Sequence, residues 1–231
     1  KLKCRHVETS EACEIGYDKL VLTTGATPIR PVIENQEAWG VTTLASVEDT
    51  DFLREVCDKQ QAQKAVVVGG GLIGLEACEA LKERGIEVTV VEFLPRVMAS
   101  LDEEMSRLVE VHLRAKGVHV ITDNGVAAVL KADDDKVRGV KLDDGQEIDC
   151  QVVVLAVGFK PNGELAGKAG LKLGARGGII VDEHMATSDP DIYAAGDCVE
   201  IINLLNGTRT PAFYGDLANV DFVYAPRFDA N

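Results

Sequence analysis

The stretch Lys64–Glu92, which reads KAVVVGGGLIGLEACEALKERGIEVTVVE, decides the fold class of this chain. It begins with a short apolar run, passes through a glycine-rich turn into a helical pattern that stops at Gly85, and closes with a second apolar run. Short apolar runs on either side of a helical segment are typical of parallel strands that are buried on both faces of a sheet. The stretch therefore predicts a β-α-β unit in which glycines join the first strand to the helix.

The three glycines of the pattern G-x-G-x-x-G, Gly69, Gly71 and Gly74, have separate physical roles in such a unit. The first permits a tight turn, the second lets a pyrophosphate approach the backbone, and the third lets the helix pack closely on the strand. Free N–H groups at the start of the helix then attract the anion. We expect a dinucleotide site lined by Gly69, Gly70, Gly71, Leu72, Ile73 and Gly74.

Glu92 ends the second strand, where the adenosine ribose of a bound dinucleotide is expected. A carboxylate there accepts hydrogen bonds from the ribose hydroxyls and repels a 2′-phosphate. Phe93 and Arg96 follow in a loop, and the Arg96 guanidinium is near enough in sequence to offset part of that repulsion. Because Glu92 stands at the strand end itself, we expect NAD(H) to be preferred over NADP(H). The alternative is that the glycines only make a tight turn, but it does not explain why a carboxylate stands at the end of the second strand.

The composition narrows the classes of partner. The chain has 231 residues and a formal net charge of −14 at pH 7. Because nucleic acids and anionic membranes bind basic surfaces, we expect neither as a partner. No apolar run is long enough to span a membrane, and the chain does not open with a signal-peptide pattern. The four histidines lack metal-ligand spacing and the six cysteines are scattered without a CxxC pair. From the histidines we expect no bound metal. From the cysteines we expect reduced thiols that serve as packing or surface residues, and hence a cytoplasmic location.

Other segments extend the α/β pattern on both sides of the glycine loop. Leu20–Thr24 is predicted as a buried strand, and helices are predicted from Ser46 and over Asp102–Lys116. Short strands separated by polar turns follow between residues 119 and 148, and Gln151–Val157 is again a buried run. The predicted fold class is α/β, with a Rossmann-like domain that combines a parallel sheet and a β-meander.

Three further motifs lie outside the glycine loop. They are YDKLVLTTGATPIRP at residues 17–31, AVGFKPN at residues 156–162 and IYAAGDCVE at residues 192–200. Together with the glycine loop, their order resembles that of the pyridine nucleotide-disulfide oxidoreductases. In that family an NAD(P)H-binding domain is inserted into an FAD-binding domain of similar fold.

The resemblance implies a division of the chain into four segments. They are a remnant of the FAD domain with a linker at residues 1–60, the NAD(H)-binding domain at residues 61–182, a second FAD-domain remnant at residues 183–219, and a tail at residues 220–231. The YAPRF run in this tail is similar to YAPPF stretches in the C-terminal dimerisation domain of coenzyme A-disulfide reductases and NADH oxidases, so the resemblance is closest to that branch.

The resemblance also assigns an FAD site. Thr24 and Gly25 match the threonine-glycine turn that approaches FAD. Asp197 matches the aspartate that accepts a hydrogen bond from a ribityl hydroxyl of the flavin, and Gly196 gives backbone access beside it. The alternative for Asp197 is a plain turn residue.

On the NAD(H) side, Val157 and Gly158 match the stretch near the nicotinamide half of the cofactor. Glu76 matches a glutamate just inside the glycine-loop helix, near the place where nicotinamide meets flavin, and it is the only candidate catalytic residue. The alternative for Glu76 is a solvated helix residue.

Two features of the family are expected but do not appear ahead of the first motif. Members open with a separate glycine loop for the FAD pyrophosphate, and the disulfide-reducing branches follow it with a redox cysteine. We therefore expect the chain to be an excerpt of a longer, homodimeric parent, with a further segment missing between Asn219 and Asp221.

The implied function is that of an FAD-dependent NAD(P)H oxidoreductase. Hydride passes from NADH to flavin and on to a disulfide, a peroxide, oxygen or a carrier, so the partner is a small-molecule or disulfide substrate or a carrier protein. The excerpt itself is expected to act chiefly as an NADH-binding module and to be inactive alone. Two alternatives stay open: a carrier reductase of the ferredoxin or rubredoxin type, and a non-catalytic module that senses NAD(H).

Overall fold

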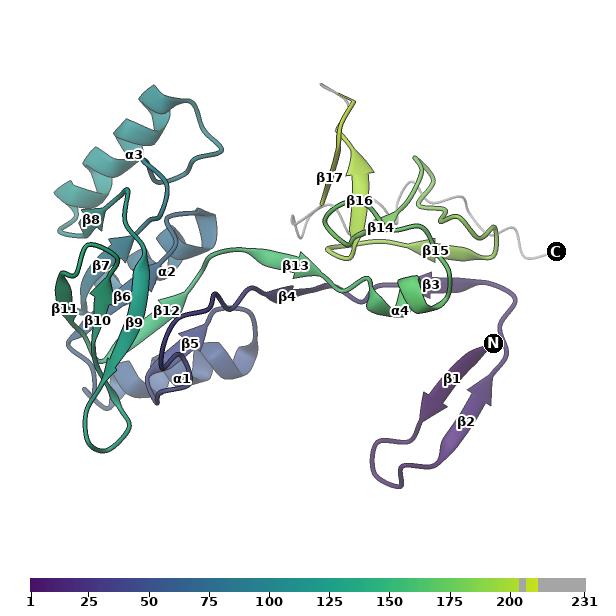
Figure 1. Ribbon diagram of the computed structural model, residues 1–231, viewed down its shortest axis with the longest axis horizontal. Coiled ribbons are helices and arrows are strands. Elements are labelled where there is room, and N and C mark those ends of the chain that lie inside the picture. Colours follow the sequence, from purple (N-terminus) through teal and green to yellow (C-terminus); the bar gives the residue numbers. More distant parts are fainter. Residues whose placement is uncertain (204–206, 212–231) are drawn as a thin grey trace. The chain divides into compact units, whose positions relative to one another are not determined.

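The computed structural model describes residues 1–203 and 207–211. The chain forms two compact units (Figure 1). The glycine-loop unit is the continuous segment Pro28–Gly158. The flanking unit combines Lys1–Thr27 with the described residues from Phe159 onward.

A five-stranded parallel sheet forms the centre of the glycine-loop unit. In spatial order its strands are β5 (Val41–Thr43), β12 (Val152–Leu155), β6 (Lys64–Val68), β7 (Glu87–Val91) and β8 (His119–Ile121). Because the strands are parallel, their carboxyl ends emerge at one edge of the sheet. That edge carries the glycine loop after β6 and Glu92 after β7.

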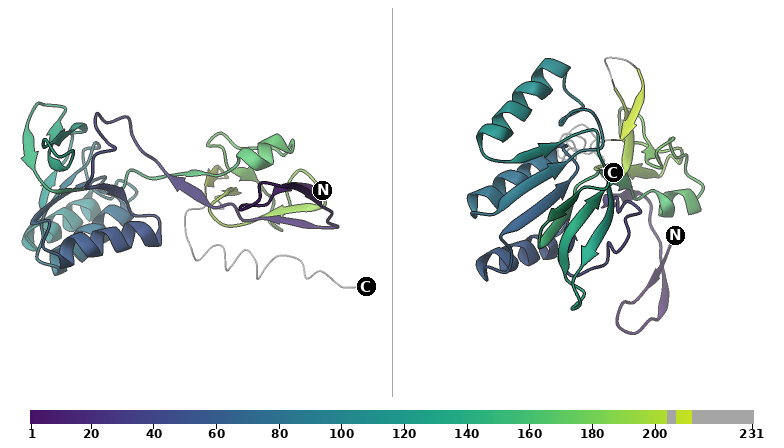
Figure 2. Two further views of the ribbon diagram at one scale, coloured as in Figure 1. Left: turned by 90° about the horizontal axis from the view of Figure 1, so that it is seen from below. Right: turned by 60° about the vertical axis from the view of Figure 1, so that its left-hand side comes forward.

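Side chains alternate between the two faces of this sheet, as the period of a strand requires. Val67 and Val154 enter a core shared with the helices, whereas Val66 and Val153 enter a core shared with a meander. The helices are α1 (Val47–Asp58), α2 (Leu72–Glu83) and α3 (Glu103–Ala115), and the antiparallel meander is β9 (Val126–Lys131), β10 (Val137–Leu142) and β11 (Glu147–Asp149). Helices and meander cover opposite faces (Figure 2). Burial of each valine stabilises the folded chain by about 1.5–3 kcal/mol, so both cores hold the sheet rigid beneath its loops.

Helix α1 begins where the sequence predicts it. Asp49 donates its N–H to the Ser46 hydroxyl at 3.1 Å, and its carboxylate accepts the Ser46 N–H at 3.2 Å, which completes a capping box. Desolvation acts to raise the pKa of the Asp49 carboxyl, but hydrogen bonds from the Ala45 N–H and the Thr43 hydroxyl lower it overall. The helix start is thus fixed by a charged cap.

The flanking unit is built from small β-sheets and one short helix, and only some of these elements contribute to its core. Its elements are β1 (Leu2–Arg5), β2 (Ala12–Ile15), β3 (Leu20–Leu22), β4 (Ala26–Pro28), β13 (Phe159–Pro161), α4 (Glu164–Lys168), β14 (Ile179–Ile180), β15 (Ile192–Ala194), β16 (Val199–Ile202) and β17 (Arg209–Pro211). β3 pairs in parallel with β15, so that Leu22 lies opposite Ala194. Both residues share a core with Ile179 and Val199. The two segments that flank the glycine-loop unit in the sequence therefore pack together in one core.

The compact units divide the chain at different residues from the domain 61–182 expected from the sequence. β5 pairs with β12, Val41 opposite Val153, and α1 buries Leu53 and Val56 in the helix-side core. These contacts place the segment before the glycine loop in the glycine-loop unit. At the other end, β14 pairs with β16 and so belongs to the flanking unit.

The tail expected at residues 220–231, and the end of the expected segment 183–219, lie outside the described residues. Within the part of the chain that is described, no helix combines the length and apolar character that crossing a membrane requires.

Candidate functional site

The backbone of the glycine loop is packed too tightly for side chains at two of its glycines. A Cβ atom on Gly74 would lie 2.0 Å from the Gly69 carbonyl oxygen, and one on Gly69 would lie 2.4 Å from the Ala156 carbonyl oxygen. Gly69 also has a φ of 108°, which L side chains rarely adopt. These two glycines therefore make the tight turn and the close approach of α2 to the sheet that the sequence predicts.

Gly71 differs from its neighbours because nothing lies within 4 Å of the place where its Cβ would be. It is the N-cap of α2, has an extended backbone and makes no side-chain cap. The first helical hydrogen bond runs from the Leu75 N–H to the Gly71 carbonyl at 3.0 Å. Among the described residues, no acceptor is recorded for the N–H groups of Leu72, Ile73 and Gly74. Open space and free N–H groups thus coincide at the helix start.

Glu92 is tied to the glycine loop through its carboxylate. One oxygen accepts the Gly70 N–H at 2.6 Å, and the other accepts the Leu94 N–H at 2.7 Å. The side chain is half-buried, and each carboxylate oxygen has a second lone pair for another donor. Glu92 is thus held at the end of β7 beside the turn, where the sequence predicts a ribose.

The loop after Glu92 packs against the glycine turn. The Met98 N–H donates to the Gly70 carbonyl at 2.8 Å, and the fully buried Ser106 of α3 donates its hydroxyl to the Met98 carbonyl at 3.1 Å. Phe93 is 73% exposed, while Arg96 is half-buried with its Nε enclosed and without a partner among the described residues.

Sequence reasoning missed this link between α3 and the glycine loop. The one available signal was a serine on the core-facing stripe that Ser106 shares with Val109 and Leu113, both of which pack on the helix-side core. Met98, with a φ of 47°, carries no such signal in its residue type.

Val157 and Gly158 leave the sheet at the same edge. β12 is the neighbour of β6, and the Ala156 N–H donates to the Val68 carbonyl at 2.8 Å, so the next two residues emerge beside the glycine loop. Gly158 has a φ of 112°, and both residues are exposed. Glu76 is exposed on α2. The carboxyl ends of β6, β7 and β12 together form the edge at which open α/β sheets bind ligands.

The candidate FAD residues meet in the flanking unit. Thr24 and Gly25 follow β3, and Gly196 and Asp197 follow β15, so the β3–β15 pairing brings both turns to one sheet edge. The Thr24 hydroxyl donates to the Asn162 carbonyl at 2.7 Å, and the Asn162 side chain donates to the Thr24 carbonyl at 2.9 Å. Asn162, from the AVGFKPN motif, therefore fixes the threonine-glycine turn.

Asp197 keeps its carboxyl available. Partial burial raises the pKa of this group, and no hydrogen bond to its oxygens is recorded among the described residues. Gly196 has a φ of 81°, which turns the chain directly after β15. A half-buried carboxylate without a donor at a sheet edge is suited to a ligand hydroxyl.

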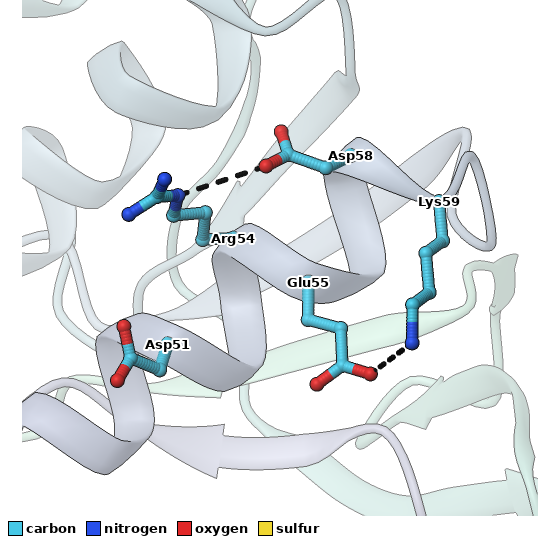
Figure 3. A pocket seen from close by; sticks show the side chains of 5 residues that line it. All are labelled: Asp51, Arg54, Glu55, Asp58 and Lys59. Carbon is cyan, nitrogen blue, oxygen red and sulfur yellow. Dashed lines mark hydrogen bonds and ion pairs between the residues drawn. The ribbon is translucent and has the colours of Figure 1, made fainter.

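A hollow on the outer side of α1 is a different kind of feature (Figure 3). It is lined by Asp51, Arg54, Glu55, Asp58 and Lys59. Arg54 pairs with Asp58 at 3.6 Å, and Lys59 pairs with Glu55. Four of these five exposed charges form ion pairs within the hollow, and none of the predicted site residues lines it, so we assign it no site. No cluster of metal-ligating side chains occurs in the described ranges either.

Comparison with known families yields one match along most of the chain. The family described as "Pyridine nucleotide-disulphide oxidoreductase" matches residues 1–212, which include every candidate site residue named above.

Individual relatives point in the same direction. The NADH oxidase of Methanocaldococcus jannaschii is 39% identical over 219 residues, which are 94% of this chain and 48% of that protein. The rubredoxin-NAD(+) reductase of Pseudomonas putida is 37% identical over 203 residues, 87% of this chain and 51% of that protein. The solved structure of an NAD-dependent persulfide reductase from A. fulgidus matches with a TM-score of 0.88 and 50% identity, over 92% of this chain and 39% of that one. The chain thus spans about half the length of these curated relatives.

Proposed function

This chain belongs to the pyridine nucleotide-disulphide oxidoreductase family, and from that premise we propose that it binds NAD(H) at the loop from Gly69 to Gly74. The observation that carries the proposal is the helix start at Gly71. Open space lies where a Cβ would be, and the free N–H groups of α2 begin there. A pyrophosphate fits this place because it needs close approach to the backbone and several donors.

The Gly70 N–H is committed to the Glu92 carboxylate, so the donors proposed for the pyrophosphate are those of Gly71 to Gly74. Glu92 would orient the adenosine ribose, and Phe93 and Arg96 would line the adenine side. Val157 and Gly158 would border the nicotinamide half, with Glu76 near its far end. The assignments at the glycine loop and after β7 rest on the position of these residues at the edge formed by β6, β7 and β12. Those near the nicotinamide rest on the family resemblance.

The parent protein is proposed to be an FAD-dependent oxidoreductase. Thr24, Gly25, Gly196 and Asp197 would hold the flavin, with Asp197 accepting a hydrogen bond from a ribityl hydroxyl. The bound nicotinamide and flavin supply the hydride chemistry. The residues of this chain bind and orient the two cofactors, and the substrate class is a disulfide, persulfide, peroxide, oxygen or carrier protein. We also infer a homodimeric parent.

A carrier reductase is the second candidate. It is favoured by the 37% identity to a rubredoxin-NAD(+) reductase. Steady-state assays of the parent with rubredoxin, oxygen and a low-molecular-weight disulfide would distinguish the two: NADH consumption that depends on rubredoxin alone supports the carrier reductase.

Preference for NADH over NADPH is tested on this chain by titration. We expect NADH to bind about 10- to 100-fold more tightly, since a charged hydrogen bond is worth about 1.5–3 kcal/mol and a 2′-phosphate faces the Glu92 carboxylate. Fluorescence of the reduced nicotinamide reports both titrations. Tighter binding of NADPH would mean that Arg96 controls the ribose side and would reverse this part of the proposal.

A further inference from the structure

Two of the six cysteines lie directly opposite each other in the hairpin β1–β2. Figure 1 shows this hairpin as two neighbouring strands. Their antiparallel register pairs Cys4 with Cys13, between the pairs Leu2–Ile15 and Arg5–Ala12. Opposed Cα atoms in such a ladder lie about 4.5–5.5 Å apart, and a disulfide bridges Cα atoms that are about 4.4–6.8 Å apart. Partners in a ladder also point to the same face of the sheet. The register therefore places the two Cα atoms within the range that a cross-strand disulfide can span.

The remaining four cysteines are in a different environment. Cys78, Cys150 and Cys198 are buried, and desolvation raises the pKa of the Cys78 and Cys150 thiols to about 12. Cys57 is half-buried on α1, and desolvation raises the pKa of its thiol as well. Cys4 is half-buried and Cys13 is exposed. Reaction with a thiol reagent requires access to the sulfur, and Cys13 is the one exposed cysteine among the described residues, so the hairpin pair is the accessible one.

We propose that Cys4 and Cys13 form a reversible dithiol–disulfide site that reacts with low-molecular-weight disulfides. One thiolate attacks the small disulfide, forms a mixed disulfide and releases the first small thiol. The second cysteine then attacks the protein sulfur of that mixed disulfide and releases the second small thiol. The protein loses two protons and two electrons, and the small disulfide is reduced to two thiols. This site is independent of the proposed nucleotide function.

The same register allows a simpler role, in which both cysteines are small apolar residues on the face that they share with Leu2 and Ile15. Equilibration with glutathione distinguishes this packing role from the proposed dithiol–disulfide role. The reduced chain is equilibrated with mixtures of reduced and oxidised glutathione, quenched with an alkylating reagent and digested with trypsin. Cleavage after Lys3, Arg5 and Lys19 separates the two cysteines. A disulfide then appears as residues 4–5 linked to residues 6–19.

Dilution at a fixed glutathione ratio gives the sharper readout. An internal disulfide releases two glutathione molecules, so diluting total glutathione tenfold should raise the ratio of disulfide to dithiol by about tenfold. A mixed disulfide with glutathione would not respond to dilution. Cys4→Ser and Cys13→Ser should each abolish the linked peptide, whereas Cys57→Ser should leave it unchanged. Free thiols throughout, mixed disulfides alone, or a disulfide between two chains would overturn the proposal.

Discussion

Replacing Glu92 tests how the cofactor side of the glycine loop is held. The carboxylate accepts two backbone N–H groups, from Gly70 at 2.6 Å and from Leu94 at 2.7 Å. A hydrogen bond to a charged group is worth about 1.5–3 kcal/mol, and water replaces part of that at a half-buried site. We therefore expect Glu92→Ala to lower the free energy of unfolding by about 1–3 kcal/mol. For a chain of this size, the melting temperature should fall by about 2–10 °C.

Glu92→Gln separates charge from support of the backbone. Glutamine keeps one oxygen acceptor for a backbone N–H, so this variant should lose less stability than Glu92→Ala. Both variants lose the negative charge that strengthens the hydrogen bonds from the ribose hydroxyls and repels a 2′-phosphate, so both should reduce the preference for NADH over NADPH by about tenfold or more. Thermal melts and paired titrations with the two nucleotides measure these quantities.

The control is Glu87→Gln at the opposite end of β7. Glu87 is exposed and lies 3.8 Å from Lys64, so this variant removes the same charge from the same strand without touching the loop. Its nucleotide preference should equal that of the unaltered chain. An unchanged NADH to NADPH ratio in Glu92→Gln would refute the role of the carboxylate in choosing the cofactor.

Three further substitutions probe the two sheet edges. Gly74→Ala should destabilise the chain by about 3 kcal/mol or more, since its Cβ would lie 2.0 Å from the Gly69 carbonyl oxygen; an unchanged denaturant midpoint would contradict this. Ser106→Ala should lower the free energy of unfolding by about 1–2 kcal/mol and weaken NADH binding, because the Met98 carbonyl loses its hydrogen-bond donor. Calorimetry measures both effects. Asp197→Asn should raise the melting temperature at pH 7, because burial raises the pKa of this carboxyl above 3.8 and so disfavours its ionised form in the fold. That gain should shrink as the pH falls towards 3.8, and a gain independent of pH would point to another cause.

Local patterns in the sequence were sufficient for the β-α-β unit. Val66 and Val67 enter opposite cores, as a strand buried on both faces requires, and the helix starts at the glycine loop. The capping box at Ser46 likewise lies within a few residues of sequence. In these cases the interactions that specify the structure are short-range, so residue spacing alone reveals them.

Long-range pairing accounts for what the sequence did not reveal. β5 is only the run Val41–Thr43, and its place beside β12 depends on parallel pairing across more than a hundred residues. The contact of Ser106 with Met98 depends on the path of the loop after Glu92. Cys4 and Cys13 become partners only through the register of the hairpin, which spacing alone does not fix.

The binding of NADH by Gly71→Ala tests the central proposal most directly. A Cβ at this position meets nothing within 4 Å and the φ of −79° suits alanine, so the variant should melt within a few degrees of the unaltered chain. The same methyl group would occupy the space that a pyrophosphate needs beside the backbone. We predict that NADH affinity falls by about tenfold or more, a loss of at least about 1.4 kcal/mol. A folded Gly71→Ala chain that binds NADH as tightly as the unaltered chain would show that the dinucleotide does not lie on this helix start.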